Sequence, residues 1–128
     1  MHYLLLIAFG ILGALSRYTV ECLIPGAPFP LATFFINITG CFAITLFARS
    51  SRFFRYLSDE YRYLISTGFI GSFTTLSAFL LEVVTLVHHG HLLLAAFYYM
   101  ATMLSGLAAC ALGVRVSHMI VSFRRERQ

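Results

Sequence analysis

Long apolar runs separated by short polar connections organise this chain from end to end. Four of these runs are each long enough to cross the hydrocarbon core of a membrane, which takes roughly 20 helical residues. They cover about residues 3–23, 31–48, 63–87 and 92–114, and apolar residues continue beyond the last run toward Phe123. The pattern predicts an all-α membrane protein with four transmembrane helices, forming a single domain over residues 1–128.

The composition agrees with a membrane-spanning chain. Hydrophobic residues make up 59% of the sequence and charged residues 11%, whereas soluble proteins average about 25% charged residues. A soluble fold of this length has too small an interior to hide so much apolar surface. The first run lacks the basic residues that precede the apolar core of a signal peptide, so we expect it to remain as a helix.

The positive charges predict how the chain is oriented. All the basic residues are arginines, and apart from Arg17 they flank the middle connection or follow the last run: Arg49, Arg52, Arg55, Arg62, Arg115, Arg124, Arg125 and Arg127. The other two connections contain no Arg or Lys. Because cytoplasmic loops carry the excess of these residues, both termini are predicted to be cytoplasmic. The charges form no patch on a polar surface, which argues against nucleic-acid binding.

A four-helix chain of this size makes a thin bundle that encloses little space. Small residues spaced four apart favour close packing between membrane helices, as in the pairs Gly10 with Ala14, Ser105 with Ala109, and Ala109 with Gly113. We therefore expect an oligomer, most simply a dimer.

The middle of the third run is dense in small and polar residues. Residues 67–79 contain two glycines and five hydroxyl side chains. Glycine weakens a membrane helix, and hydroxyls can bond the backbone groups that a break sets free. A helix broken at the membrane midplane can bind ions through its carbonyls and helix ends. The alternative is a continuous helix packed through its glycines. The density of these residues alone leaves both interpretations open, and the fold we expect has a break in the third helix.

Two further sets of polar residues lie deep in the runs, where polar groups are costly and rarely accidental. Asn37 follows Thr33 by one turn in the second run, and its amide either lines a pathway or bonds a neighbouring helix. Tyr98, Thr102 and Ser105 share one face of the fourth run. This hydroxyl stripe is either a contact to a partner helix or a track for an anion.

Two charged residues are also buried within the runs. Glu82 is the only deep acid, and it shares a helix face with Thr75 and Phe79. Arg17 is the only deep base, and it either pairs with Glu21 at i+4 or contributes to a positive vestibule. A purely structural ion pair is the alternative role for both.

Neither metal nor enzyme chemistry is indicated by the sequence. The cysteines lack metal-ligand spacing and are interpreted as small packing residues: Cys22, Cys41 and Cys110. The histidines of the connection 88–91 are interpreted as a tight interfacial turn. The chain has no Ser/His/Asp arrangement, no carboxylate pair and no phosphate-binding glycine loop, so we expect no enzyme.

Three motifs in this order resemble the Fluc/CrcB family of bacterial fluoride channels along the whole chain. They are Gly13-Ala14-Leu15-Ser16-Arg17-Tyr18, Asn37-Ile38-Thr39-Gly40, and the segment from Thr67 to Phe79. The resemblance implies a fluoride-selective channel subunit in the bacterial cytoplasmic (inner) membrane, which exports fluoride passively and reduces its toxicity. It also implies an antiparallel dimer with two pores and a structural Na⁺ at its centre.

The resemblance further implies roles for individual residues. Phe79 would match the second of the family's two pore phenylalanines. The carbonyls of Gly71 and Thr74 would bind the Na⁺, while Arg17 and Glu82 would match charged residues of the family's first and third helices. The fluoride pathway would be lined by Asn37, Thr33, Thr75, Leu76, Ser77, Phe79, Thr102 and Ser105.

The chain departs from the family in two respects. Leu76 stands where the family has its first pore phenylalanine, and Gly106 and Cys110 fall near its hydroxyl track. The arginine bias also fixes one orientation, whereas an antiparallel homodimer needs both. An oppositely inserted homologue as partner would explain both departures. The alternatives are a homodimer, a non-conducting partner subunit, and a small multidrug-resistance-type antiporter, although that class needs a glutamate in the first run.

Overall fold

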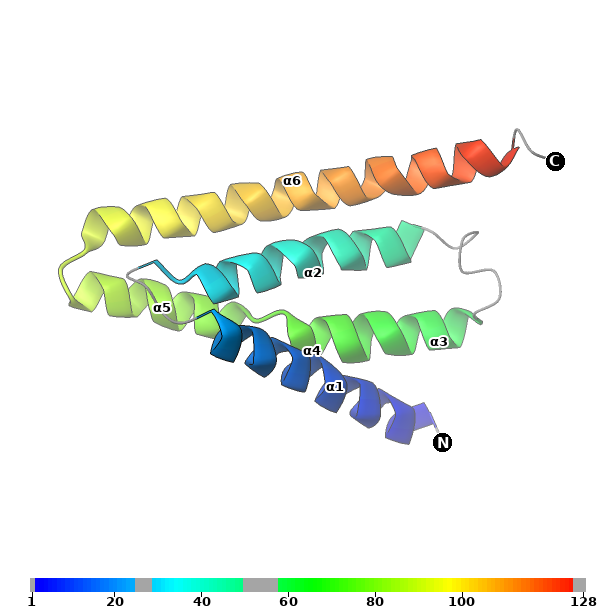
Figure 1. Ribbon diagram of the computed structural model, residues 1–128, viewed down its shortest axis with the longest axis horizontal. Coiled ribbons are helices and arrows are strands. Elements are labelled where there is room, and N and C mark those ends of the chain that lie inside the picture. Colours follow the sequence, from blue (N-terminus) through cyan, green and yellow to red (C-terminus); the bar gives the residue numbers. More distant parts are fainter. Residues whose placement is uncertain (1, 25–28, 50–57, 126–128) are drawn as a thin grey trace.

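The computed structural model describes residues 2–24, 29–49 and 58–125, and they form an antiparallel helix bundle (Figure 1). The first, second and fourth spans are continuous helices: α1 (His2–Leu23), α2 (Leu31–Arg49) and α6 (Leu92–Arg125). The third span is assembled from α3 (Asp59–Tyr63), η1 (Leu64–Ile70), α4 (Gly71–Phe73) and α5 (Leu76–His88). Four spans are long and apolar enough to cross a membrane, and no strand occurs in the described ranges. The predicted all-α fold with a break in the third helix is confirmed.

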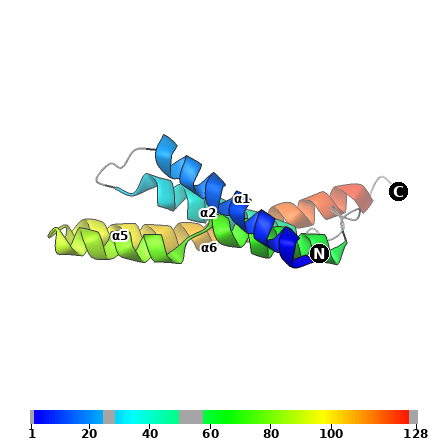
Figure 2. The same cartoon turned by 90° about the horizontal axis from the view of Figure 1, so that it is seen from below.

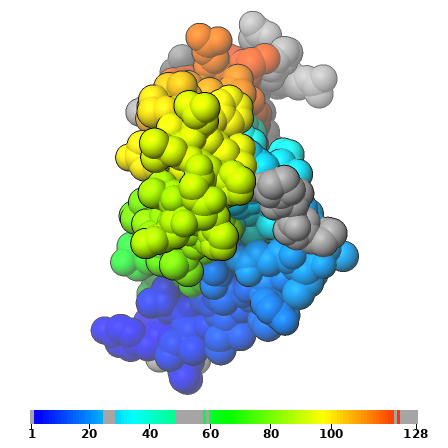
Figure 3. Space-filling model, turned by 90° about the vertical axis from the view of Figure 1, so that its left-hand side faces the viewer, coloured from blue at the N-terminus to red at the C-terminus, as the bar shows by residue number. Residues whose placement is uncertain are grey.

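The spans are arranged as a thin bundle. Helix α6 packs along α2 and α5, while α1 packs against η1 and α4 (Figure 2). Both ends of the described chain lie at one end of the bundle, together with the end of α2 and the start of α3 (Figure 1). Figure 3 looks onto the opposite end, with α1 at one edge and α6 at the other. Large apolar side chains remain exposed on the outer faces, as expected for contact with lipid or with another subunit.

Glycines set how closely the spans approach. A Cβ atom at Gly13 would collide with the carbonyl oxygen of Phe69 in η1, so α1 can lie here only because Gly13 has no side chain. On α6, a Cβ atom at Gly113 would come 2.9 Å from the carbonyl oxygen of Phe42. Ala109, one turn before Gly113, is buried as well. The predicted small-residue contact is therefore made on α6, whereas on α1 the closest approach is at Gly13 rather than at Gly10.

The third span changes its helical geometry before it breaks. In η1 the turns are wider than in an α-helix, and the Gly71 N–H donates to the carbonyl of Ser66 five residues earlier. The helix then stops at two extended residues, Thr74 (φ −76°, ψ 153°) and Thr75 (φ −145°, ψ 119°). Thr75 starts the next helix, because its hydroxyl oxygen accepts a hydrogen bond of 3.2 Å from the Ala78 N–H. The break therefore lies at two threonines rather than at a glycine.

The connection between α5 and α6 is the predicted tight turn. Gly90 adopts φ 79°, and the His91 N–H donates to the Leu86 carbonyl at 2.9 Å. Helix α6 then runs for 34 residues to Arg125, well past the predicted apolar range. The apolar run predicts only the part of the helix that crosses the hydrocarbon core, and the helix itself can extend beyond that core. Of the predicted connections 25–30 and 49–62, residues 25–28 and 50–57 lie outside the described residues. Helix α3 starts at Asp59, within the second predicted connection.

Candidate functional site

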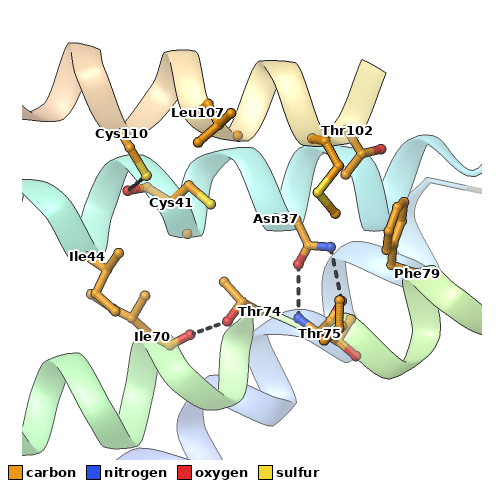
Figure 4. A pocket seen from close by; sticks show the side chains of 14 residues that line it. Asn37, Cys41, Ile44, Ile70, Thr74, Thr75, Phe79, Thr102, Leu107 and Cys110 are labelled. Carbon is orange, nitrogen blue, oxygen red and sulfur yellow. Dashed lines mark hydrogen bonds between the residues drawn. The ribbon is translucent and has the colours of Figure 1, made fainter. Parts of the chain in front are cut away.

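A pocket lies between α2, the break in the third span, the start of α5 and the middle of α6 (Figure 4). It offers about 420 Å³ to water-sized molecules. Its polar lining gathers at one end, around Asn37, Thr75 and Thr102, beside the ring of Phe79 (Figure 4). The remaining lining residues are small or apolar: Gly40, Cys41, Ile44, Ile70, Thr74, Leu76, Met103, Gly106, Leu107 and Cys110.

Both the oxygen and the nitrogen of the Asn37 amide form hydrogen bonds with the backbone of Thr75 at the break. Its oxygen Oδ1 accepts a hydrogen bond of 2.9 Å from the Thr75 N–H. Its nitrogen Nδ2 donates a hydrogen bond of 3.0 Å to the Thr75 carbonyl. Asn37 therefore ties α2 to the start of α5, and Figure 4 shows the two bonds side by side.

After the break, the chain leads from the pocket-lining Thr75 to the buried aromatic ring of Phe79. The hydroxyls of Thr75 and Ser77 lie 3.3 Å apart. The ring of Phe79 is only 1% exposed, and its centroid lies 5.2 Å from that of Tyr98 in an edge-on arrangement. Leu76 is 65% exposed although it lines the pocket. The pocket therefore combines a fixed ring on one side with an open rim on the other.

The half-buried carboxyl group of Glu82 lies one turn beyond this ring. The Thr33 hydroxyl donates to Oε1 of Glu82 at 2.6 Å, and the Tyr98 hydroxyl donates to Oε2 at 2.7 Å. Thr33 is 2% exposed and Tyr98 is fully buried. Both oxygens of the carboxyl group therefore accept a hydrogen bond from another helix. The three side chains join α2, α5 and α6.

We expect the substitution Tyr98→Phe to destabilise the bundle by about 2 kcal/mol, since it removes a hydrogen bond and leaves Oε2 of the half-buried Glu82 without its partner. The neighbouring substitution Tyr99→Phe is the matched control, because Tyr99 lies on the same helix and is 40% exposed. Thermal unfolding of the purified protein in detergent measures both. Equal losses of stability in the two variants would contradict the assigned role of the Tyr98 hydroxyl.

Residues 4–114 match the family described as CrcB-like protein, Camphor Resistance (CrcB). The chain belongs to the CrcB family. It is 41% identical to "Fluoride-specific ion channel FluC" of Acidobacterium capsulatum, over 95% of this chain and 100% of that protein. It is also 38% identical to "Fluoride-specific ion channel FluC 1" of Bacillus cereus (93% of this chain, 85% of that protein) and 34% identical to "FluC 2" of Listeria innocua (94% of each).

The CrcB match includes every residue predicted for the site, but the structure does not bring all of them together. Thr74 lines the pocket, whereas Gly71 is exposed one turn before it, on the other side of the break. Thr102 lines the pocket, and its hydroxyl donates to the Tyr98 carbonyl at 2.8 Å. Ser105 stands between the lining residues Met103 and Gly106 on α6 but is not part of the lining, and the exposed Ser77 is not part of it either.

Arg17 is placed away from the pocket in this CrcB chain. Its guanidinium lies 3.6 Å from the carboxylate of Glu21, the local pairing that the sequence allows. Its Nε is buried and has no hydrogen-bond partner among the described residues. The pairing shows where the side chain lies, and a vestibule role stays a prediction.

Two contributions to the site were not predicted from the CrcB motifs. Tyr98 was assigned to a hydroxyl stripe, yet it completes the hydrogen bonding of Glu82. Gly40 was quoted only as part of a motif, yet a Cβ atom there would collide with the methyl group of Thr74 at the break. The spacing of Asn37 and Gly40, one turn apart on α2, was the signal that both contact the same segment.

Proposed function

We propose that this chain is a subunit of a fluoride-selective channel that lets fluoride leave the cell passively and so lowers its toxicity. The observation that carries the proposal is the meeting of Asn37, Thr75 and Phe79 at the break of the third span. Relatives with 34–41% identity over nearly the whole chain are named fluoride-specific ion channels, which supports the same ion here.

The chemistry of the pocket suits a small anion. Fluoride is strongly hydrated, so a pathway must replace its water with donors at close range. The hydroxyls of Thr75 and Ser77, the second N–H of Asn37 and the positive edge of the Phe79 ring are such donors. A lining of short donors and ring edges favours fluoride over larger halides, because a larger anion cannot approach all of them at once.

We further propose that a second, antiparallel subunit covers the pocket. Leu76 and Leu107 line it and are 65% and 69% exposed, so one chain leaves the rim open. The arginine-bearing end of α2 at Arg49, helix α3 with Arg62, and the end of α6 at Arg125 lie at the same end of the bundle as the N-terminus of the described chain (Figure 1). This supports cytoplasmic termini in the bacterial inner membrane, and an oppositely inserted homologue as the partner. A second copy of this chain is the alternative partner.

A structural Na⁺ shared between the two subunits is part of the proposal. In an unbroken helix the Thr75 N–H would donate to the carbonyl of Gly71, but here it donates to Asn37. The Ala78 N–H, which would be the helical partner of the Thr74 carbonyl, likewise donates to the Thr75 hydroxyl. The carbonyls of Gly71 and Thr74 are thereby released from these helical bonds, and such hard oxygen ligands suit the cation. Two oxygens are too few for it, so the partner would supply the rest. When bound, the ion would add positive charge near the break.

Fluoride efflux from liposomes tests the channel directly. The purified chain is reconstituted from detergent, where neither orientation is imposed, and efflux is followed with a fluoride electrode. We expect fast efflux that needs no proton gradient. The substitution Phe79→Ile should slow it about tenfold, which corresponds to roughly 1.4 kcal/mol of lost ring-edge stabilisation. Phe97→Ile, a ring that is 64% exposed on α6, is the matched control and should leave the flux unchanged.

Each other outcome selects a different function. Slow efflux coupled to protons or to an organic cation would indicate an antiporter. No efflux from the chain alone, but fast efflux together with a homologue, would indicate a non-conducting partner subunit, which agrees with Leu76 in place of a ring. Flux that is insensitive to Phe79→Ile would contradict the proposed site.

A further inference from the structure

The break in the third span leaves backbone groups that need partners. Thr74 and Thr75 are both extended, so the Thr75 N–H cannot reach the Gly71 carbonyl with which it would pair in a helix. An unpaired N–H in the middle of a membrane span costs several kcal/mol. The Asn37 amide supplies the missing acceptor at 2.9 Å and, through Nδ2, also holds the Thr75 carbonyl at 3.0 Å.

These two bonds use most of the hydrogen-bonding capacity of the Asn37 side chain. A primary amide has one carbonyl oxygen and two N–H donors. The oxygen and one N–H are bonded to Thr75, which fixes the amide plane and leaves a single N–H. Asn37 therefore cannot turn toward a passing ion without releasing the backbone of the break.

The position of Thr75 in turn determines the start of α5. Its hydroxyl oxygen accepts from the Ala78 N–H at 3.2 Å and lies 3.3 Å from the Ser77 hydroxyl. Phe79 follows within the first turn of α5 and is buried against Tyr98. Moving Thr75 therefore moves its own hydroxyl and the Phe79 ring, which line the pocket, and the neighbouring Ser77 hydroxyl with them.

We infer that Asn37 is a positioning residue: its amide clamps Thr75 and thereby orients the donors of the pathway, rather than serving mainly as a ligand for the anion. The inference deepens the proposed channel function and depends on it for its effect on flux. The clamp itself is a property of the folded chain and can be tested without any transport.

The substitution Asn37→Asp separates the two roles, because its two protonation states differ in the bonds they can make. The protonated carboxyl has one acceptor and one O–H, so it can reproduce both bonds to Thr75. The carboxylate keeps the bond to the Thr75 N–H but places a second acceptor against the Thr75 carbonyl. A carboxyl group in an apolar pocket facing a carbonyl favours the protonated form. Acidification should therefore restore the clamp, whereas a carboxylate cannot.

Two quantities are measured on the native protein, Asn37→Ala and Asn37→Asp, in alkaline and in mildly acidic buffer. One is fluoride efflux from liposomes, corrected for empty vesicles. The other is hydrogen exchange of the Thr75 amide, followed by NMR of the ¹⁵N-labelled protein in detergent. The other titratable groups around this segment are Glu82, Cys41, Cys110, Tyr98 and Tyr99, and the pH profile of the native protein accounts for them. Thr39→Ala is the matched control on α2, because its hydroxyl bonds only its own helix, to the carbonyls of Phe35 and Ile36.

We expect Asn37→Ala to speed exchange of the Thr75 amide about tenfold, the effect of one lost hydrogen bond, and to reduce efflux at both pH values. Asn37→Asp should lose protection and flux in alkaline buffer and regain both on acidification. If the Asn37 variants lose flux while the hydrogen-exchange rate of the Thr75 amide stays unchanged, the inference is overturned and Asn37 is a direct ligand of the anion. If the native protein passes no fluoride, the channel proposal fails, and exchange of the Thr75 amide alone decides whether Asn37 forms the clamp.

Discussion

Adding a single methyl group at Gly13 is expected to destabilise the folded chain by about 3 kcal/mol. The new Cβ atom would collide with the carbonyl oxygen of Phe69 and lie 3.0 Å and 3.1 Å from its carbonyl carbon and Cα. These are backbone atoms of η1, so no side chain can turn aside to make room. Gly13→Ala should therefore push α1 away from the third span, next to the break that shapes the pocket.

The substitution Gly10→Ala is the matched control for Gly13→Ala. It lies one turn earlier on the same helix, where a Cβ atom would meet only the Ser72 hydroxyl at 3.4 Å, an ordinary contact. We expect its stability to stay within about 0.5 kcal/mol of the native value, because alanine is also the better helix former. Unfolding of both variants in mixed detergent micelles measures the difference. If Gly10→Ala costs as much as Gly13→Ala, close packing at Gly13 is not what holds α1 in place.

Much of the fold could be predicted from the sequence because the bilayer imposes simple rules. Apolar length alone located all four spans, since a helix must be long enough to cross the hydrocarbon core. The density of glycine and hydroxyl residues between 67 and 79 predicted a break in the third span, which is confirmed. The site of the break was less predictable. It falls at Thr74 and Thr75, because Asn37 from another helix can satisfy the freed N–H there.

The candidate site depended on contacts between helices, which a single sequence does not encode directly. The cost of polar groups in lipid and the family motifs together singled out Asn37, Thr75 and Phe79, and all three line the pocket. That Asn37 bonds the backbone of Thr75 could not, because it depends on how α2 is turned and shifted against the third span. The same holds for Glu82, whose partners come from two other helices.

The arginine distribution leads to a prediction with an all-or-none result in cells. Insertion follows the excess of Arg and Lys on the cytoplasmic side, so every copy of this chain should insert the same way up. An antiparallel pair then cannot form from one chain. In a host that lacks a fluoride exporter, the native chain expressed alone should give no protection against fluoride, although it conducts after reconstitution from detergent.

A variant with its charges moved to the other end should supply the missing orientation. Its substitutions exchange arginines of the middle connection and of the C-terminal tail for glutamine, and histidines of the α5–α6 turn for arginine: Arg49→Gln, Arg52→Gln, Arg55→Gln, Arg62→Gln, Arg124→Gln, Arg125→Gln, Arg127→Gln, His88→Arg, His89→Arg and His91→Arg. Cysteine labelling at the C-terminus from each side of the membrane reports the orientation. We expect each chain alone to leave cells sensitive to fluoride and the two together to protect them, because only the mixture contains both orientations. Full protection by the native chain alone would show that the charge bias does not prevent it from pairing with itself.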